Sequence, residues 1–345
     1  MEQNLTEGDS STSSRRLIST GVLARFIVDT GSQIFNPFLP IVAAGLKTNV
    51  VTLGWLVSLR SAMGLLAPVF GSLADRRGYR PVMCFGLVFC SIGSLIVGIS
   101  GNLMLAAIGM LCWGIGIAAF VPTLHAYLSS QLPYERRARG IGILEYSWAL
   151  AGIVGLFSMG LLISVSSWRA PFLVISFGLV VMAFVVQKLP AVETRKKAST
   201  VGGSKNFLDF FRLGSNSVSA YATIVSGACF GFAAMQVFIA HGEWLSREYG
   251  IGAAGLGTIA MLLGCTDLCG SVSVSLFVDR IGKRRSVLLG CVGAFFGYLL
   301  MPILNVNLYL AVLGLAIART CFEFAIVSNI ALLSNVRANY GAFDC

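Results

Sequence analysis

One short motif occurs twice in this chain, and each copy lies between two long apolar segments. Residues 75–80 read Asp-Arg-Arg-Gly-Tyr-Arg, and residues 279–284 read Asp-Arg-Ile-Gly-Lys-Arg, an offset of 204 residues. A repeated basic turn between apolar segments indicates a membrane protein built from two related halves. The same offset pairs residue 345 with residue 141, so we expect the counterparts of residues 141–188 to be absent.

The apolar segments have the length of transmembrane helices. The chain is 56% hydrophobic and 12% charged, whereas soluble domains carry about 25% charged residues. A helix needs about 17–25 apolar residues to cross a bilayer, and barrel strands would alternate polar and apolar residues instead. We therefore predict an all-α polytopic membrane protein, with two pseudo-symmetric helical bundles of six and four spans. The predicted spans are 18–45, 52–73, 82–99, 103–128, 141–163, 171–187, 217–240, 254–278, 287–304 and 308–333.

The positive charge of the chain indicates its orientation. The formal net charge is +10, but most Lys and Arg residues fall on the side of the spans that holds the N-terminus. Because basic residues concentrate in cytoplasmic loops, we predict a multi-pass protein of the cell membrane with a cytoplasmic N-terminus. Its surroundings are then the lipid bilayer, and the charge is no sign of nucleic-acid binding.

Four regions are expected along the chain. Residues 1–16 are polar and are predicted to form a disordered cytoplasmic tail, and residues 17–188 the six-helix bundle. Residues 189–215 carry several basic residues and are predicted to be a cytoplasmic linker. Residues 216–345 should form an incomplete bundle of four helices. Nine cysteines and two histidines show no metal-ligand spacing, and we expect no metal, no cofactor and no enzymatic site.

The duplicated motif resembles a known family signature. Residues 71–80 are similar to the G-x-L-A-D-R-x-G-R-K motif of the major facilitator superfamily, and the second copy has Ser275 in place of the leading glycine. The resemblance runs from about Leu17 to Gly341. It implies ten of the usual twelve helices, so that the chain looks truncated. Met110 stands where the family has an arginine in its fourth helix, and the fifth span lacks a Gly-Pro pair; neither departure favours drug antiport.

The resemblance assigns a gating role to the motif. In the family the aspartate lies against the N-terminus of a helix in the other half, where the helix dipole favours a carboxylate. Asp279 should then meet the start of the fifth span, near Gly140, and the partner of Asp75 should lie in an eleventh helix that is absent here. The gating residues expected by resemblance are Gly71, Asp75, Arg76, Gly78, Arg80, Asp279, Arg280, Gly282 and Arg284.

Five charged residues lie deep in the predicted spans. They are Asp29, Arg60, Asp267, Arg319 and Glu323. Burying each in a bilayer costs about 2.5–3.5 kcal/mol on insertion scales. None has a charged counterpart at the offset of 204, so the repeated scaffold does not account for them. We regard all five as candidates for substrate binding or proton coupling.

Structural explanations for these charges remain open. Arg319 and Glu323 are spaced i,i+4 and would neutralise each other on one helix face. Arg25 and Asp29 have the same spacing. Asp267 has no partner on its own helix, and would either bridge to Arg60 in the other half or carry a proton.

Two further residues near the inner surface have structural interpretations. Glu145 is expected to form an ion pair with Arg280 or Arg284. His125 is expected to make a hydrogen bond near the inner end of the fourth span.

Taken together, the sequence predicts a secondary active transporter of a small solute, working by alternating access and coupled to protons. Its partners would be a small-molecule substrate and a coupling proton. The alternative is a truncated membrane protein that keeps this scaffold and transports nothing.

Overall fold

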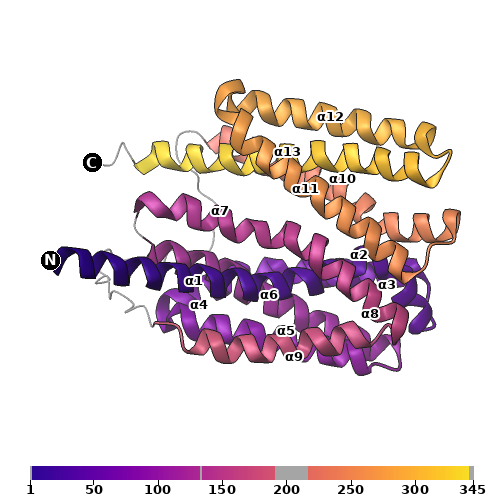
Figure 1. Cartoon of the computed structure of the whole chain (residues 1–345), viewed down its shortest axis with the longest axis horizontal. Coiled ribbons are helices and arrows are strands. Elements are labelled where there is room, and N and C mark those ends of the chain that lie inside the picture. The colour runs from indigo at the N-terminus through magenta and orange to yellow at the C-terminus, as the bar shows by residue number, and fades with distance from the viewer. Residues whose placement is uncertain (1, 133, 191–216, 342–345) are drawn as a thin grey trace. The chain divides into compact units, whose positions relative to one another are not determined.

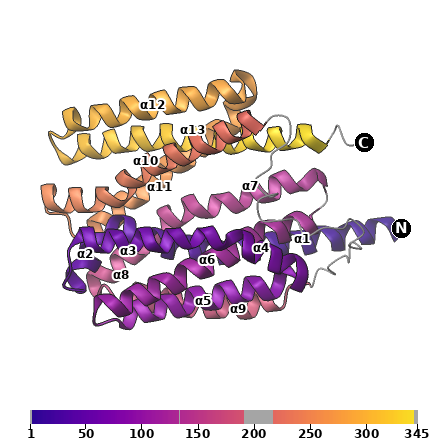
Figure 2. The ribbon, with the colours of Figure 1, turned by 180° about the vertical axis from the view of Figure 1, so that it is seen from behind.

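The computed structural model describes residues 2–132, 134–190 and 217–341, and the regular structure among them is entirely helical (Figures 1 and 2). The helices are α1 (Glu2–Gln33), α2 (Phe35–Gly45), α3 (Val50–Ala62), α4 (Ala67–Arg77), α5 (Tyr79–Ile99), α6 (Leu103–Gln131), α7 (Tyr134–Leu150), α8 (Phe157–Val165), α9 (Ala170–Gln187), α10 (Ser217–Tyr249), α11 (Ala253–Ile281), α12 (Lys283–Leu304) and α13 (Leu308–Gly341). A 3₁₀ turn, Met63–Leu66, precedes α4, and a π-helical turn, Ala151–Leu156, joins α7 to α8.

Nine helices of the described residues are long and apolar enough to cross a membrane, when α3 with α4 and α7 with α8 are each counted as one helix through the turn that joins them. They correspond to nine of the ten predicted spans. The remaining predicted span, 18–45, is the first along the chain. It is divided at Ile34 into α1 and the short apolar α2. Pro37 has no N–H to donate to the carbonyl four residues earlier, which weakens the helix at this point. Pro68 has the same effect on the 3₁₀ turn that divides α3 from α4.

Packing divides the chain into two units, each described separately below. Unit 1 comprises Met1–Arg195 with Ile239–Met261, and unit 2 comprises Lys196–Phe238 with Leu262–Cys345. The bundle boundaries at 188 and 216 therefore stay a prediction. Most of the predicted linker lies outside the described residues. The backbone of α1 begins at Glu2 and so extends over the predicted tail, whose side chains before Arg16 also lie outside them.

The duplicated motif has the same backbone in both copies. Gly78 ends α4 with φ +96°, and Gly282 ends α11 with φ +93°. The N–H of Gly78 donates to the carbonyl of Ala74 at 2.8 Å, and that of Gly282 donates to Val278 at 2.9 Å. Since residues with a side chain are strained at such φ values, both turns need glycine. The prediction of a tight glycine turn in each copy is confirmed.

Replacing Gly78 with alanine is expected to destabilise the protein by about 1–3 kcal/mol, because the turn forces the new side chain into a backbone region that glycine alone occupies readily. The measurement is the thermal unfolding midpoint in detergent. Gly54→Ala is the matched control, since no atom lies within 4 Å of a Cβ added there. Equal midpoints for the two variants would contradict the strained turn.

Glycines also bring neighbouring helices into contact. A Cβ on Gly93 of α5 would lie 2.6 Å from the carbonyl oxygen of Gly109 in α6, and one on Gly86 would lie 2.8 Å from that of Gly116. In unit 2 a Cβ on Gly297 of α12 would lie 2.7 Å from Cα of Ala318 in α13. Small residues substitute here for a hydrophobic driving force that lipid cannot supply.

The close contacts follow the internal repeat. Gly86 and Gly93 recur, at the same offset of 204, as Gly290 and Gly297. Gly290 in turn packs on Ala325, with its added Cβ 2.7 Å from that residue's Cβ. The pairs α5–α6 and α12–α13 run side by side in both views of the ribbon (Figures 1 and 2). The repeat found in the turns thus extends into the packing of the spans.

Candidate functional site

Arg25 of α1 joins three helices of unit 1. Its Nε donates to both carboxylate oxygens of Asp29, at 3.3 and 3.2 Å, on the same face of α1. Nη2 donates to Oε2 of Glu145 in α7 at 3.4 Å, and Nη1 lies 2.6 Å from Nε2 of His125 in α6. Arg25 is 8% exposed and Asp29 4%. The possible i,i+4 pair of Arg25 and Asp29 therefore forms, within a larger cluster.

Asp29 has a second partner on α7. Ser147 Oγ donates to its Oδ2 at 2.7 Å, and one turn further along α1, Gln33 Nε2 donates to the carbonyl of Trp148 at 3.0 Å. These bonds hold α7 against α1. Because a buried carboxylate is stable only when it is paired and hydrogen-bonded, they explain how Asp29 is accommodated in the interior.

His125 lies between a cation and an anion. Its Nε2 is 3.3 Å from Oε1 of Glu145 and 2.6 Å from the Arg25 guanidinium, which can only donate. A neutral imidazole accepts from Arg25 through Nε2, whereas a protonated one donates to Glu145. The sequence had suggested separate structural roles for His125 and Glu145. Their junction at Arg25 depends on the packing of three helices, and no spacing within one helix indicates it.

A cavity of about 250 Å³ opens beside this cluster. Its lining includes two arginines and one aspartate: Arg25, Val28, Asp29, Ser32, Arg60, Ser61, Gly64, Gly114, Ile117, Val121 and Trp148. Gly114 allows α6 to approach α3, since an added Cβ would contact the backbone carbonyl of Arg60. The cavity thus brings the predicted candidates Asp29 and Arg60 to one site within unit 1.

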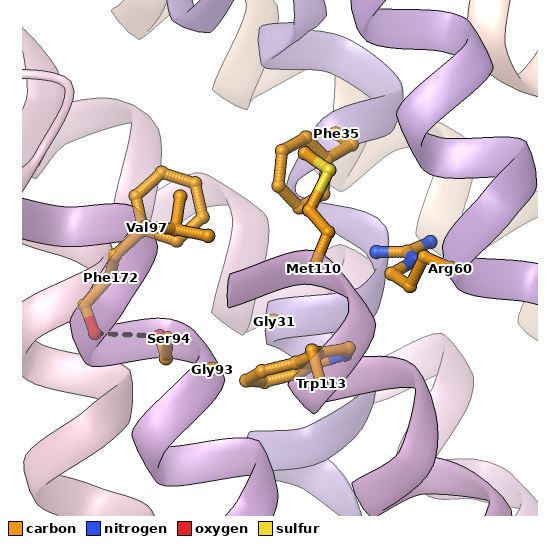
Figure 3. A pocket seen from close by; sticks show the side chains of 9 residues that line it. All are labelled: Gly31, Phe35, Arg60, Gly93, Ser94, Val97, Met110, Trp113 and Phe172. Carbon is orange, nitrogen blue, oxygen red and sulfur yellow. Dashed lines mark hydrogen bonds between the residues drawn. The ribbon is translucent and has the colours of Figure 1, made fainter. Parts of the chain in front are cut away.

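Arg60 also lines a second, smaller cavity of about 10 Å³ (Figure 3). Nη1 of Arg60 donates to the carbonyl of Ser32 at 3.2 Å, and its Cζ lies 5.2 Å from the centre of the Phe35 ring. In Figure 3 the guanidinium points toward Phe35 and Met110. The indole Nε1 of Trp113, which also borders this cavity, is buried without a hydrogen-bond acceptor.

In unit 2 a buried ion pair joins α11 to α13. Arg319 Nε donates to Oδ1 of Asp267 at 3.0 Å, and Arg319 Nη2 contacts Oδ2. Asp267 is 2% exposed and Arg319 6%. The Arg319 guanidinium also stacks on Phe238, with Cζ 3.9 Å from the ring centre.

This pair differs from the one that the spacing suggested. One explanation left open by the sequence was that Arg319 neutralises Glu323 on its own helix, but its ion pair is with Asp267 on α11. Glu323 accepts a hydrogen bond at 2.9 Å from Ser271, also on α11. A bidentate guanidinium–carboxylate contact is stronger and more specific than an i,i+4 contact along one helix.

The motif residues make local contacts at the helix ends. Tyr79 donates from its hydroxyl to Oδ1 of Asp75 at 3.3 Å, and Arg80 Nη1 donates to the carbonyl of Leu189, just after α9, at 2.8 Å. Arg76, Arg280 and Arg284 are exposed. No atom lies within 4 Å of a Cβ added to Gly71. The side chain of Asp279 lies outside the described residues, so its gating contact stays a prediction.

Clustered metal ligands are absent from the part of the chain that the structure describes, where no three His, Cys, Asp or Glu residues could hold an ion. A bundle of apolar helices, with ion pairs in each unit and a polar cavity in one of them, defines a polytopic membrane protein with ionisable groups in its interior. The chain belongs to the Major Facilitator Superfamily, whose profile matches residues 21–342. Members of this family are transporters and not enzymes, which confirms both the predicted family and the predicted lack of enzymatic activity.

Curated relatives are uncharacterised or diverse in name. The MFS-type transporters YwfA and YceJ of Bacillus subtilis are 27% identical over 271 residues and 23% identical over 293 residues. The alignments cover 76% and 84% of this chain, and 64% and 73% of the relatives. The sialic acid transporter NanX of Escherichia coli is 21% identical over 66% of this chain and 55% of its own length. The chain therefore spans less than two thirds of YwfA.

Solved transporters share the fold at low identity. The D-xylose–proton symporter matches with a TM-score of 0.70 at 14% identity, over 94% of this chain and 88% of its own. A bacterial homologue of the lysosomal transporter Spinster, in an inward-facing conformation, matches with a TM-score of 0.62 at 17% identity, over 93% of this chain and 74% of its own. These matches confirm the all-α fold class predicted from the apolar segments.

Proposed function

We propose that the protein is a secondary active transporter that moves a small solute by alternating access and couples this movement to protons. The observation that carries the proposal is the buried Asp267–Arg319 pair, which the internal repeat does not explain. Ionisable residues at membrane depth are expensive and mark substrate, ion or proton pathways. The cytoplasmic N-terminus, the two bundles and the gating role of Asp75 and Asp279 form part of the same proposal.

Proton coupling needs a carboxylate that can be protonated when its cation leaves it. Asp267 and Asp29 are both held by arginines in the interior of their units. Protonating either aspartate removes the charge that its arginine compensates, so the ion pair is weakened and the arginine is released. A buried acid–base pair of this kind links proton uptake to a change in helix contacts.

The names of the relatives point to different transported solutes. NanX is named a sialic acid transporter, and two further Bacillus subtilis proteins are named multidrug resistance proteins. Such diversity at 21–22% identity supports transport of a small solute but does not indicate its chemical class. The class is inferred below from the residues that line the cavity.

Replacing Asp267 with asparagine is expected to abolish uptake driven by a pH gradient, because asparagine keeps the size of the side chain and cannot bind the proton. The measurement compares proton-gradient-driven uptake with counterflow exchange in proteoliposomes, and counterflow should persist. Glu248→Gln, at an exposed position, is the matched control. Unchanged gradient-driven uptake in the Asp267 variant would remove this residue from the coupling mechanism.

A further inference from the structure

Arg60 is a half-buried cation of unit 1, at membrane depth, whose contacts include no carboxylate among the described residues. It donates to a backbone carbonyl, that of Ser32, and lies over the ring of Phe35. The two buried arginines at membrane depth, Arg25 and Arg319, each hold an aspartate. A guanidinium at membrane depth is costly unless something compensates its charge. A reversibly bound anion would compensate the charge of Arg60.

The cavity that Arg60 faces has room for such an anion. Its volume of about 250 Å³ is that of roughly eight water molecules at ~30 Å³ each. This lies just below the range of about 300–1,000 Å³ typical of ligand pockets, which points to a small molecule.

The lining combines polar and apolar side chains. The hydroxyls of Ser32 and Ser61 border the cavity, together with the apolar side chains of Val28, Ile117 and Trp148. A ligand with a charged end and a short apolar body would suit such a mixed lining.

The charges around the cavity favour an anion over a cation. Asp29 is the acid in the lining, and its oxygens already accept from Arg25 and Ser147. Arg60 offers N–H donors in a planar fork that matches a carboxylate. Among the groups that line the larger cavity, the guanidinium of Arg60 therefore has N–H groups left for a ligand, whereas Arg25, Ser32 and Ser61 already donate within the protein.

We propose that this cavity binds the carboxylate of a small amphipathic organic anion, with Arg60 as its binding residue and Val28, Ile117 and Trp148 against its apolar body. The inference rests on the proposed transport function, because it names the class of the transported solute. It also explains why Arg60 has no charged counterpart in the second half of the chain.

The test is isothermal titration calorimetry of the full chain in phosphatidylcholine nanodiscs. The probes are acetate, butyrate and benzoate, each with its uncharged amide, and benzylamine as a cation of similar shape. At least one carboxylate should bind about tenfold or more tightly than its amide, the expected gain from a hydrogen bond to a charged group. Arg60→Gln should remove this preference. Lys188→Gln, which deletes the same charge at an exposed helix end, should leave it unchanged.

Arg60→Lys is a second variant that keeps the proposal testable if Arg60→Gln does not fold. It keeps the charge but loses the planar fork, so carboxylate affinity should fall several-fold. The proposal is overturned if no carboxylate is preferred over its amide, if Arg60→Gln keeps the preference, or if Arg60→Lys binds as tightly as the parent. Tightest binding of benzylamine would also overturn it, and would assign Asp29 as the binding group.

Counterflow of the preferred carboxylate in proteoliposomes separates this inference from the proposed function. Binding that depends on Arg60, without counterflow, would contradict transport and leave the anion site standing. Counterflow of an uncharged solute, without carboxylate binding, would contradict the anion site alone.

Discussion

Replacing Arg319 with alanine is expected to lower the free energy of unfolding by about 3–5 kcal/mol. The variant leaves Asp267, which is 2% exposed, without the guanidinium that both of its oxygens contact. A buried carboxylate that loses its cation keeps the cost of its desolvation and gains nothing in return. The measurement is a thermal or denaturant unfolding curve in detergent micelles.

Two further variants separate the ion pair from a general effect of mutation. The double variant Asp267→Leu/Arg319→Met removes both charges and keeps the volume, so it should recover most of the lost stability. Arg247→Ala is the control, because that side chain is 81% exposed and its contact with Glu243 is 3.9 Å long; exposed pairs contribute little. A double variant as unstable as Arg319→Ala would contradict the proposed cause.

Replacing Gly93 with leucine should separate α5 from α6 and prevent correct assembly of unit 1. Even a Cβ at this position would lie 2.6 Å from the backbone of Gly109 and Trp113, and backbone cannot rotate away as a side chain can. Overpacking typically costs about 1–3 kcal/mol, and more where the neighbour is rigid. The yield of monodisperse protein by size-exclusion chromatography and the unfolding midpoint would show the effect.

A graded series makes this result specific to the helix contact. Gly93→Ala should be less damaging than Gly93→Leu, and Gly297→Ala should cause a similar loss at the equivalent place in unit 2, where the added Cβ meets Ala318. Gly54→Ala, with open space around it, should be neutral or slightly stabilising because alanine favours helix. Equal stability for Gly54→Ala and Gly93→Ala would show that the helices can move apart at no cost.

The turns and the membrane spans could be predicted from the sequence because each depends on the residues of a short segment. Apolar segments of the right length predicted the helices, nine of which are candidate membrane spans, and the repeated glycines predicted the two tight turns, where φ is near +95°. The same local reasoning did not find the break at Ile34 within the first span. Pro37 was visible in the sequence, but prolines are tolerated in many membrane helices, so its presence alone does not place a break.

The charged residues were found from the sequence, but only one of their ion-pair partners was suggested correctly. The cost of burying a charge singled out five residues that lie in apolar segments: Asp29, Arg60, Asp267, Arg319 and Glu323. Spacing along one helix correctly suggested Arg25 for Asp29. It suggested Glu323 for Arg319, whose ion pair is with Asp267 on another helix.

The sequence by itself determined the class of fold, the family and the list of costly buried charges, because apolar length, a repeated motif and desolvation are properties of short segments. Only the tertiary structure decided how those charges combine. The junction of Arg25 with His125 and Glu145, and the cavity in front of Arg60, arise where separate helices meet. Which helix faces meet is set by packing over the whole unit, in part by glycines such as Gly114 that let backbones touch.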